Sequence, residues 1–317
     1  EDVAYGGENI FTYNLVNYLQ KNNICIEYNL NAGIDIFLII DPFPGQYKKY
    51  GLVDIINFKK KYKLNSKIII RVNDCDITRK NINKKNSREV CIYRNYKNID
   101  YLIYNSDFIK EYYLKNYPGL KEIKSCVIYN GGNSDIFFPL EKKILNNKSK
   151  IKIVTHHWSD NINKGYDIYY KLWKYSQRKH SGIEFKFIGR KFNDKFNNEV
   201  PVIGPYKGEK LADELRKCDI YITASINDSC PNHVIEGLLC GLPILYINHK
   251  GGGKNLCELI KSCKIGEHFN NFVELINYIH MIRKHYSSYR QNVINNSDKF
   301  NNNLCFNNYL ELFQNIN

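Results

Sequence analysis

The stretch DIYITASINDSCPNHVIEGLLCGLPILYI, residues 219–247, decides the fold of this chain of 317 residues. Its two ends are short runs of β-branched, aromatic and aliphatic residues, which predict buried strands over 219–225 and 243–247. Between them, Pro231 stands where the first turn of a helix tolerates proline, and Gly241 stands where a helix ends. One face of this predicted helix is apolar: Val234, Ile235, Leu238 and Leu239. The stretch therefore predicts a strand–loop–helix–strand unit of an α/β protein.

Two carboxylates lie near the start of that helix. Asp228 is in the loop just before it, and Glu236 is about one to two turns inside it. The helix start offers unpaired backbone N–H groups and a partial positive charge, which suit a phosphate. Two acids beside an anion site are better suited to accept hydrogen bonds from hydroxyls on either side of the anion. A nucleotide sugar has this layout, with ribose hydroxyls, a diphosphate and sugar hydroxyls in a row.

The same residues resemble the donor-binding signature of GT-B-fold glycosyltransferases, in particular the retaining family 4 group. That signature is an acid, seven residues, a glutamate and then small-x-Gly-x-Pro. Here it runs from Asp228 to Glu236 and continues as Cys240-Gly241-Leu242-Pro243. The family usually has Glu at the first position, so Asp228 is shorter by one methylene. Without the resemblance, the same residues also fit an ordinary βαβ unit with a surface Asp and a surface Glu.

Length and composition favour a globular protein of two ordinary domains, because 43% of the residues are hydrophobic. The longest apolar run, Ile36–Ile40, fits a strand and is far too short to cross a membrane. The chain begins at Glu1, and we expect a first strand to precede it. No signal-peptide pattern is present.

The cysteines and the net charge bear on compartment and partners. Ten Cys are scattered without a Cys-x-x-Cys pair, which indicates reduced thiols in a cytoplasmic protein and argues against a zinc site or a disulfide framework. The net charge of +14 suits anions such as sugar nucleotides, an acidic membrane surface or nucleic acid. A general preference for Lys, Asn, Ile and Tyr explains the charge equally well, and no nucleic-acid-binding signature accompanies it.

The first part of the chain alternates strands with helices, which predicts a parallel sheet covered by helices. We expect strands at 24–28, 35–40, 67–71 and 101–104, a strand that runs into a turn over 126–132, and helices at 10–20, 53–62 and 106–113; residues 81–97 fit a loop or an exposed helix. Polar residues follow the strand at 67–71, where open α/β sheets bind ligands. Arg71, Asn73, Asp74 and Asp76 are therefore candidates for binding an acceptor; the alternative is that these residues cap the next segment locally.

A polar segment at 141–150 is the expected linker to a second α/β unit. In that unit we expect strands at 151–155, 185–190 and 202–206, helices at 166–175, 209–218, 269–285 and 306–313, and only helices after residue 255. Lys164-Gly165, at the start of the helix 166–175, can bring an ammonium group and backbone amides to a phosphate.

The resemblance implies a role for each site residue. Lys164 and the helix start formed by Pro231, Asn232 and His233 would hold the donor diphosphate. Glu236 would bind the ribose and Asp228 the sugar ring, with Lys164 and Asp228 as the catalytic pair.

The remaining roles are implied by the ends of other elements. Gly6 and Gly7, before the first helix, would face the donor phosphates. Arg190 and Tyr206, at two strand ends, would hold the base. The family usually has an Arg at one of the positions occupied by Trp158 and Ser159, and His156, His157 or Arg190 are candidates to replace it. The glycines of 250–255 resemble, in part, the loop that follows the donor motif.

Together these observations predict two Rossmann-like domains facing a cleft, the GT-B fold, with domains at 1–145 and 146–298 and a C-terminal helix at 299–317 that returns to the first domain. The implied activity is a metal-independent, retaining transfer of a sugar from a UDP- or GDP-type nucleotide sugar, without a cofactor, to a glycan, lipid-linked or protein-linked acceptor. The expected location is cytoplasmic, with peripheral contact to an acidic membrane surface left open and no nucleic-acid partner. The alternatives are a non-catalytic nucleotide-sugar-binding protein and another GT-B enzyme such as an epimerase.

Overall fold

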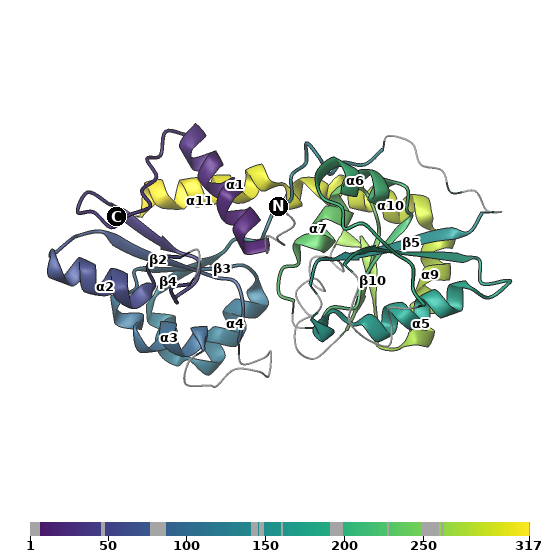
Figure 1. The fold of residues 1–317 in the computed structure, drawn as a ribbon, viewed down its shortest axis with the longest axis horizontal. Helices are drawn as coiled ribbons and strands as arrows, with labels where there is room; N and C mark the ends of the chain where they lie inside the picture. The colour runs from purple at the N-terminus through teal and green to yellow at the C-terminus, as the bar shows by residue number, and fades with distance from the viewer. Residues whose placement is uncertain are drawn as a thin grey trace. The chain divides into compact units, whose positions relative to one another are not determined.

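The computed structural model describes residues 7–45, 48–76, 87–140, 145, 149–159, 161–190, 199–226, 228–248, 260 and 263–316. The chain divides into two compact units. Unit 1 comprises Glu1–Tyr129 and Cys305–Asn317, and unit 2 comprises Asn130–Leu304. Both units are α/β, as the sequence predicts, and each is built on its own parallel sheet (Figure 1).

Unit 1 contains a four-stranded parallel sheet in the order β1-β2-β3-β4. The strands are β1 (Ile36–Ile39), β2 (Lys67–Val72), β3 (Tyr101–Tyr104) and β4 (Lys124–Val127). Both faces of this sheet are covered, and β1, β3 and residues 68–70 of β2 are accordingly runs of consecutive apolar or aromatic residues rather than alternating ones.

The helices of unit 1 cover the two faces of its sheet (Figure 1). On one face lie α1 (Gly7–Lys21) and, from Cys305 onward, α11 (Asn302–Asn315); on the other lie α2 (Leu52–Lys61), α3 (Arg88–Arg94) and α4 (Asp107–Asn116), with short 3-10 turns η3 (Tyr96–Asn98) and η4 (Pro118–Glu122). Alternate side chains of β2 point to opposite faces: Ile69 packs with α1 and α11, whereas Ile68 and Ile70 pack with α2 and α4.

Unit 2 contains a six-stranded parallel sheet in the order β10-β9-β8-β5-β6-β7. The strands are β5 (Ile151–His157), β6 (Ile183–Gly189), β7 (Val202–Ile203), β8 (Ile220–Thr223), β9 (Ile244–Ile247) and β10 (Gly266–Phe269). Because β5 and β8 are neighbours, the loops that follow them emerge side by side at the carboxyl edge of the sheet.

The helices of unit 2 also lie on both faces of its sheet (Figure 1). One face carries α5 (Tyr166–Ser176) and α9 (Phe272–Lys284); the other carries α6 (Gly208–Arg216), α7 (Asn232–Leu239) and α10 (Tyr286–Asn296), and the 3-10 turns are η5 (Ile162–Lys164) and η6 (Ser297–Phe300). The core under α5 and α9 is large and aromatic, and includes the fully buried Tyr169 and Phe269.

Besides the strand expected at 202–206, of which only Val202–Ile203 (β7) is formed, four sequence expectations about strands need correction. Residues 24–28 form no strand: Ile24 and Ile26 pack against the α1 and α11 core, but the segment has no ladder with the described strands. The strand expected at 126–132 is β4, which begins and ends earlier. The strand expected at 151–155 continues to His157, because pairing with β6 extends that far.

The fourth correction concerns β10, which lies in the segment expected to be only helical. It is four residues long and contains Gly266, Glu267 and His268, so its composition does not indicate a strand. Parallel pairing with β9 defines it. Within the described residues, no helix combines the length and the hydrophobicity needed to cross a membrane.

Candidate functional site

The loop that carries Lys164 is locked onto the loop that follows β8. Gly165 is the N-cap of α5 and adopts a left-handed backbone with φ of 79°; a Cβ there would lie 2.2 Å from the Ala224 carbonyl oxygen. Only glycine combines this conformation with such a close approach. The Ile226 amide donates to the Asn163 carbonyl over 2.7 Å. The backbone thereby holds Lys164 beside the segment that leads to Asp228.

Lys164 and Asp228 form an ion pair, with 2.6 Å between Nζ and Oδ2 and with each side chain 23% exposed. Burial disfavours a charged carboxylate, but the Lys164 ammonium and the adjacent His233 outweigh that effect and hold the pKa of Asp228 well below its usual range. The pair therefore presents a partly buried ammonium group next to an ionised carboxylate.

Helix α7 begins directly after this pair. Its N-cap, Pro231, offers no side-chain cap. The amides of Val234 and Ile235 turn back to the Pro231 carbonyl, and helix geometry leaves the preceding amides of Asn232 and His233 without an intrahelical acceptor. These two amides are suited to an anion near Lys164.

Asn130 fixes the chain at this helix start. Its side-chain Nδ2 donates to the Cys230 carbonyl over 2.9 Å and to Asn232 Oδ1 over 2.8 Å. Asn130 lies in the Asn-Gly-Gly turn, and Gly132 approaches Ile235 and Leu239 so closely that a Cβ would lie 2.5 Å from the nearer side chain. Asn130 is not among the residues predicted from the sequence, because nothing in the sequence places it beside a segment 100 residues away.

Tyr221 lies beneath α7 on β8. The helix can approach the ring because Gly237 has no side chain; a Cβ at Gly237 would lie 2.6 Å from Tyr221 Cδ2. The Tyr221 hydroxyl lies 2.9 Å from His233 Nδ1 and 3.1 Å from His156 Nδ1, and it accepts from the His156 backbone amide over 3.2 Å. Burial raises the pKa of this hydroxyl well above its usual range, so it stays protonated.

His156 connects this group to the second acid. Its Nε2 lies 2.7 Å from Glu236 Oε2, and the ring is 2% exposed whereas the Glu236 side chain is 27% exposed. The residues brought together in unit 2 are thus Lys164, Asp228, Asn232, His233 and Glu236, with the sequence-predicted Pro231 as N-cap and with His156 and Tyr221 behind them. The sequence offers His156 as a candidate phosphate ligand, whereas in the structure its two ring nitrogens contact Glu236 and Tyr221.

The two other histidines near this site, His157 and His233, also have partners inside unit 2. His157 Nε2 lies 2.8 Å from the Tyr169 hydroxyl, and complete burial lowers the His157 pKa well below its usual range. Burial likewise lowers the pKa of His233 to about 4, although Asp228, 3.6 Å from its Nε2, acts in the opposite direction. Both imidazoles are therefore neutral at neutral pH.

Two predicted residues of unit 2 lie at other strand ends. Arg190 follows β6, with its guanidinium 5.9 Å from the centre of the Trp158 ring. Tyr206 follows β7 and is covered by Lys210, whose ammonium lies 4.3 Å from the ring centre.

The predicted acceptor residues follow β2 in unit 1. Arg71 is 3% exposed; its Nε donates to the Tyr309 hydroxyl over 2.9 Å, its guanidinium lies 3.7 Å from the Phe11 ring centre, and it also contacts Asn73. Asp74 Oδ1 accepts from the Cys75 amide over 2.8 Å. Gly7 is the first residue of α1, while Gly6 and the glycine loop at 250–255 lie outside the described residues.

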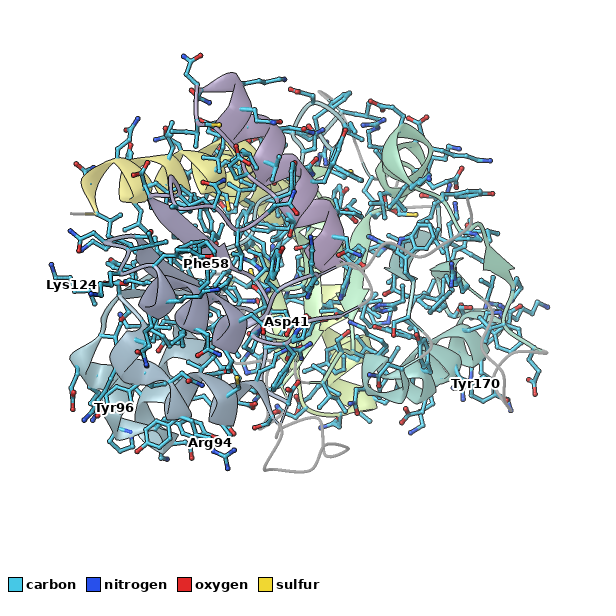
Figure 2. All side chains as sticks on the ribbon, turned by 60° about the vertical axis from the view of Figure 1, so that its left-hand side comes forward. Asp41, Phe58, Arg94, Tyr96, Lys124 and Tyr170 are labelled. Atoms are coloured by element: carbon cyan, nitrogen blue, oxygen red, sulfur yellow. The ribbon has the colours of Figure 1, made fainter. Side chains whose placement is uncertain are left out.

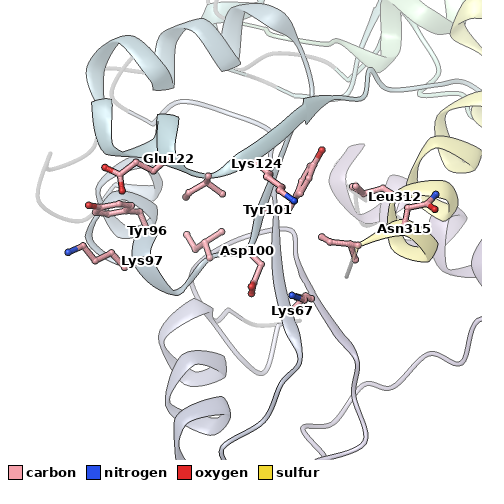
Figure 3. Close-up of a pocket in the computed structure, with 12 residues that line it drawn as sticks. Lys67, Tyr96, Lys97, Asp100, Tyr101, Glu122, Lys124, Leu312 and Asn315 are labelled. Carbon is pink, nitrogen blue, oxygen red and sulfur yellow. The ribbon is translucent and has the colours of Figure 1, made fainter.

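A pocket of 690 Å³ lies away from these residues, at the edge of the unit 1 sheet where the strands begin (Figure 3). Lys67, Tyr101 and Lys124 line it from the starts of β2, β3 and β4, and Leu312 and Asn315 line it from α11. Tyr96 and Lys124 lie on the same side of this unit in Figure 2. A neighbouring pocket of 400 Å³ is lined by Lys59, Lys60, Lys63 and Lys97, among others. In the described part of the chain, no group of three or more His, Cys, Asp or Glu residues is arranged to hold a metal ion.

Comparison with known proteins gives one family. The profile of the family described as glycosyl transferases group 1 matches residues 138–299. No curated protein sequence matches the chain.

Solved structures resemble the whole chain. Sucrose-phosphate synthase from Thermosynechococcus elongatus aligns with a TM-score of 0.66 and 15% identity over 98% of this chain and 93% of its own. Anabaena Alr3699/HepE, solved with UDP and glucose, aligns with a TM-score of 0.67 and 14% identity, over 98% of this chain and 96% of its own. WaaG, a glycosyltransferase involved in lipopolysaccharide biosynthesis, aligns with a TM-score of 0.65 and 11% identity, over 99% of this chain and 97% of its own. These similarities confirm the GT-B fold expected from the sequence.

Proposed function

The chain belongs to the glycosyl transferases group 1 family, and on this premise we propose that it transfers a sugar from a nucleotide-diphosphate sugar to an acceptor hydroxyl, with retention at the anomeric carbon. The single observation that supports this proposal best is the Lys164–Asp228 pair at the start of α7, with Glu236 further along the same helix. This arrangement offers positive charge for a diphosphate between two carboxylates for hydroxyls.

We assign the diphosphate to Lys164 and to the amides of Asn232 and His233. In the free protein the ammonium of Lys164 is neutralised by Asp228. A bound diphosphate carries more negative charge and would compete for that ammonium. Asp228 would then accept hydrogen bonds from the sugar hydroxyls, and Glu236 from the ribose. Developing charge on the leaving diphosphate would be stabilised by fixed donors, without a protein nucleophile.

UDP is the nucleotide we propose first, because the structure of Alr3699/HepE was solved with UDP and that of pneumococcal GtfA with UDP and GlcNAc. Arg190 and Tyr206 are proposed to contact the base. Arg71, Asn73 and Asp74 of unit 1 are proposed to bind a glycan, lipid-linked or protein-linked acceptor, and Gly6 and Gly7 to approach the donor. The charge at the diphosphate would come from Lys164 and the helix start, so we expect transfer to continue in the presence of EDTA.

We also propose that the protein works in the cytoplasm, in peripheral contact with an acidic membrane surface. Support comes from the lysine-lined pockets of unit 1, where Lys59 is paired with Asp100 but Lys60, Lys63 and Lys97 are exposed. Such clusters attract anionic lipid head groups.

The test is a panel of UDP- and GDP-sugars added to the purified protein, followed by thermal unfolding and by analysis of the sugar. A donor at 100 times its Kd should add about 2.7 kcal/mol to the free energy of unfolding. Transfer to an acceptor with retained configuration supports the proposal. An isomerised sugar without acceptor would indicate an epimerase, and binding without turnover would indicate a non-catalytic binding protein. Absence of stabilisation by every nucleotide sugar contradicts all three.

A further inference from the structure

The turn at residues 130–132 is tied to the segment that leads into α11. The Gly132 amide donates to the Phe300 carbonyl over 2.8 Å, and the Asn302 amide donates to the Gly132 carbonyl over 2.9 Å. All of these residues belong to unit 2. The side chain of Asn130 therefore extends from a stretch of backbone that is itself fixed within that unit.

Asn130 holds the residues at the start of α7. It is 9% exposed, and its side-chain Nδ2 donates to the Cys230 carbonyl over 2.9 Å and to Asn232 Oδ1 over 2.8 Å. Its backbone amide lies 3.3 Å from Cys230 Sγ. One residue thus fixes both the last turn of the loop and the first residue of the helix.

These contacts determine which way the two carboxamide groups face. A backbone carbonyl can only accept, so the Asn130 atom that faces the Cys230 carbonyl must be the nitrogen. The same NH2 group has a second proton, so the Asn232 atom beside it must be the acceptor, Oδ1. Rotating the Asn130 carboxamide by half a turn would bring two acceptors together, and rotating that of Asn232 would bring two donors together. Hydrogen-bond chemistry therefore assigns the orientation of Asn232.

The NH2 group of Asn232 is the end of the carboxamide that faces away from Asn130. In the described part of the chain, no protein group lies within hydrogen-bond distance of it. Asn232 is partly exposed and is the first residue of α7. An anion bound to the backbone amide of this residue can therefore also be reached by its side-chain NH2 group.

The position of this NH2 group points to an anion as its partner. Asn232 lies in the segment that continues from Asp228, and the Lys164 ammonium lies 2.6 Å from the Asp228 carboxylate. The helix start also offers the backbone amides of Asn232 and His233. An additional neutral donor at this place adds to the same binding capacity.

We propose that the Asn232 side chain is a further donor to the diphosphate of the nucleotide sugar, and that Asn130 is a positioning residue that keeps the NH2 group of Asn232 available to it. A carbonyl oxygen in the place of that NH2 group would repel the phosphate oxygens, so the orientation matters as much as the contact. The donor role rests on the proposed function, whereas the orientation of the two carboxamides does not.

The first test measures the binding of UDP and of GDP by calorimetry. Asn232→Ala removes the NH2 group and should weaken the binding of the nucleotide that the wild type takes by roughly tenfold or more, as expected for a lost hydrogen bond to a charged group. Asn232→Asp keeps an acceptor for Asn130 but replaces the NH2 group with negative charge, and should weaken binding further. The control is Asn292→Ala, which breaks a side-chain contact with the Lys264 carbonyl and should bind as the wild type does. Wild-type affinity in Asn232→Ala overturns the donor role.

The second test separates positioning from folding. Asn130→Ala should weaken nucleotide binding in the wild-type background and much less in Asn232→Ala, because the group that Asn130 orients is then gone. A purely structural role of Asn130 predicts the same loss in both backgrounds, and that result overturns the positioning role.

If Asn130→Ala does not fold, the side-chain NH2 signals of the ¹⁵N-labelled wild type decide instead. Those of Asn130 should be protected from exchange with solvent in the free protein. Those of Asn232, identified by their absence from Asn232→Ala, should exchange freely and shift when the nucleotide is added. Unprotected Asn130 signals, or Asn232 signals that the nucleotide leaves unchanged, overturn the proposal.

The proposed function and this inference fail in different ways. If the wild type binds neither UDP nor GDP, the proposed function fails, and the donor role of Asn232 fails with it. If the wild type binds one of them and Asn232→Ala binds it equally well, only the donor role fails.

Discussion

At the scale of single residues, the notable feature is a lysine and an aspartate that neutralise each other next to a helix start. Sequence motifs point to Lys164 and Asp228 separately, but the 2.6 Å contact between them depends on two loops 64 residues apart. The pairing keeps a partly buried charge compensated in the free protein. It also holds the ammonium beside the segment that leads into α7, where we propose that it stabilises the leaving diphosphate after binding.

Replacing Lys164 with Ala should lower turnover by roughly 10²-fold, because a fixed positive donor to the leaving group is lost. The measurement is the rate of sugar transfer at saturating donor, below the melting temperature of the variant. Lys171→Ala, which removes an exposed lysine of α5, is the control and should leave the rate unchanged. Equal rates for the two variants would remove Lys164 from the mechanism.

Acid should destabilise the protein through His233. Its pKa of about 4 lies below the ordinary 6.5 because burial favours the neutral ring. The contribution of His233 to the free energy of unfolding is therefore complete above pH 6.5 and is lost as the pH falls from 6.5 toward 4. The full shift of the His233 pKa corresponds to a loss of roughly 3 kcal/mol in the free energy of unfolding. His157, whose pKa is also lowered by burial, acts in the same direction.

The measurement is the urea midpoint between pH 4 and pH 7. His233→Gln should show a shallower fall than the wild type. His180→Gln, at an exposed histidine, should follow the wild type. A wild type whose midpoint rises on acidification would contradict the buried neutral state.

At the scale of elements, glycines decide how closely helices and loops approach the strands of unit 2. Gly165 brings the Lys164 loop against Ala224, and Gly237 brings α7 against Tyr221. Helix α7 is only eight residues long, so tertiary packing rather than intrinsic propensity maintains it.

Gly165→Ala should destabilise the protein and weaken donor binding. A left-handed backbone costs an alanine about 1–2 kcal/mol, and the contact with the Ala224 carbonyl adds to that cost. Gly208→Ala is the matched control: its φ is 57°, but nothing lies within 4 Å of the added Cβ. Thermal unfolding and donor KM should both change more in Gly165→Ala; equal changes would mean that the close contact has no effect.

Helix α11 supplies the apolar cover for one face of the unit 1 sheet. Phe306, Tyr309 and Leu310 are buried there against Phe11 and Ile69. Deleting residues 305–317 should lower the free energy of unfolding by about 5 kcal/mol or more, at about 1.5–3 kcal/mol for each large side chain. Urea denaturation measures the loss of stability, and dye binding measures the apolar surface that the deletion exposes. Deleting only 315–317 removes one partly buried core contact, Ile316, and should have a much smaller effect. Unchanged stability of the longer deletion would contradict the packing role.

At the scale of the whole molecule, the net charge of +14 includes a local concentration of lysines on unit 1. Changing Lys60, Lys63 and Lys97 to Gln should weaken binding to anionic vesicles roughly 100-fold at low salt, at about 1 kcal/mol for each lysine. Changing Lys171, Lys179 and Lys284 of unit 2 removes the same charge elsewhere and is the control. Co-sedimentation with vesicles containing phosphatidylserine measures both; equal losses would indicate that only net charge matters.

Local properties of the chain were enough to predict the α/β class, the family signature and most of the elements, because apolar periodicity, caps and the spacing from Asp228 to Glu236 can all be read without knowing the fold. It missed β10 and extended no strand to His157, because both depend on pairing with a distant strand. Only the tertiary structure brought His156, Tyr221 and His233 into one buried hydrogen-bonded group. The physical reason is that a buried polar group must find a partner through space, and the partner's position in the sequence is unrestricted.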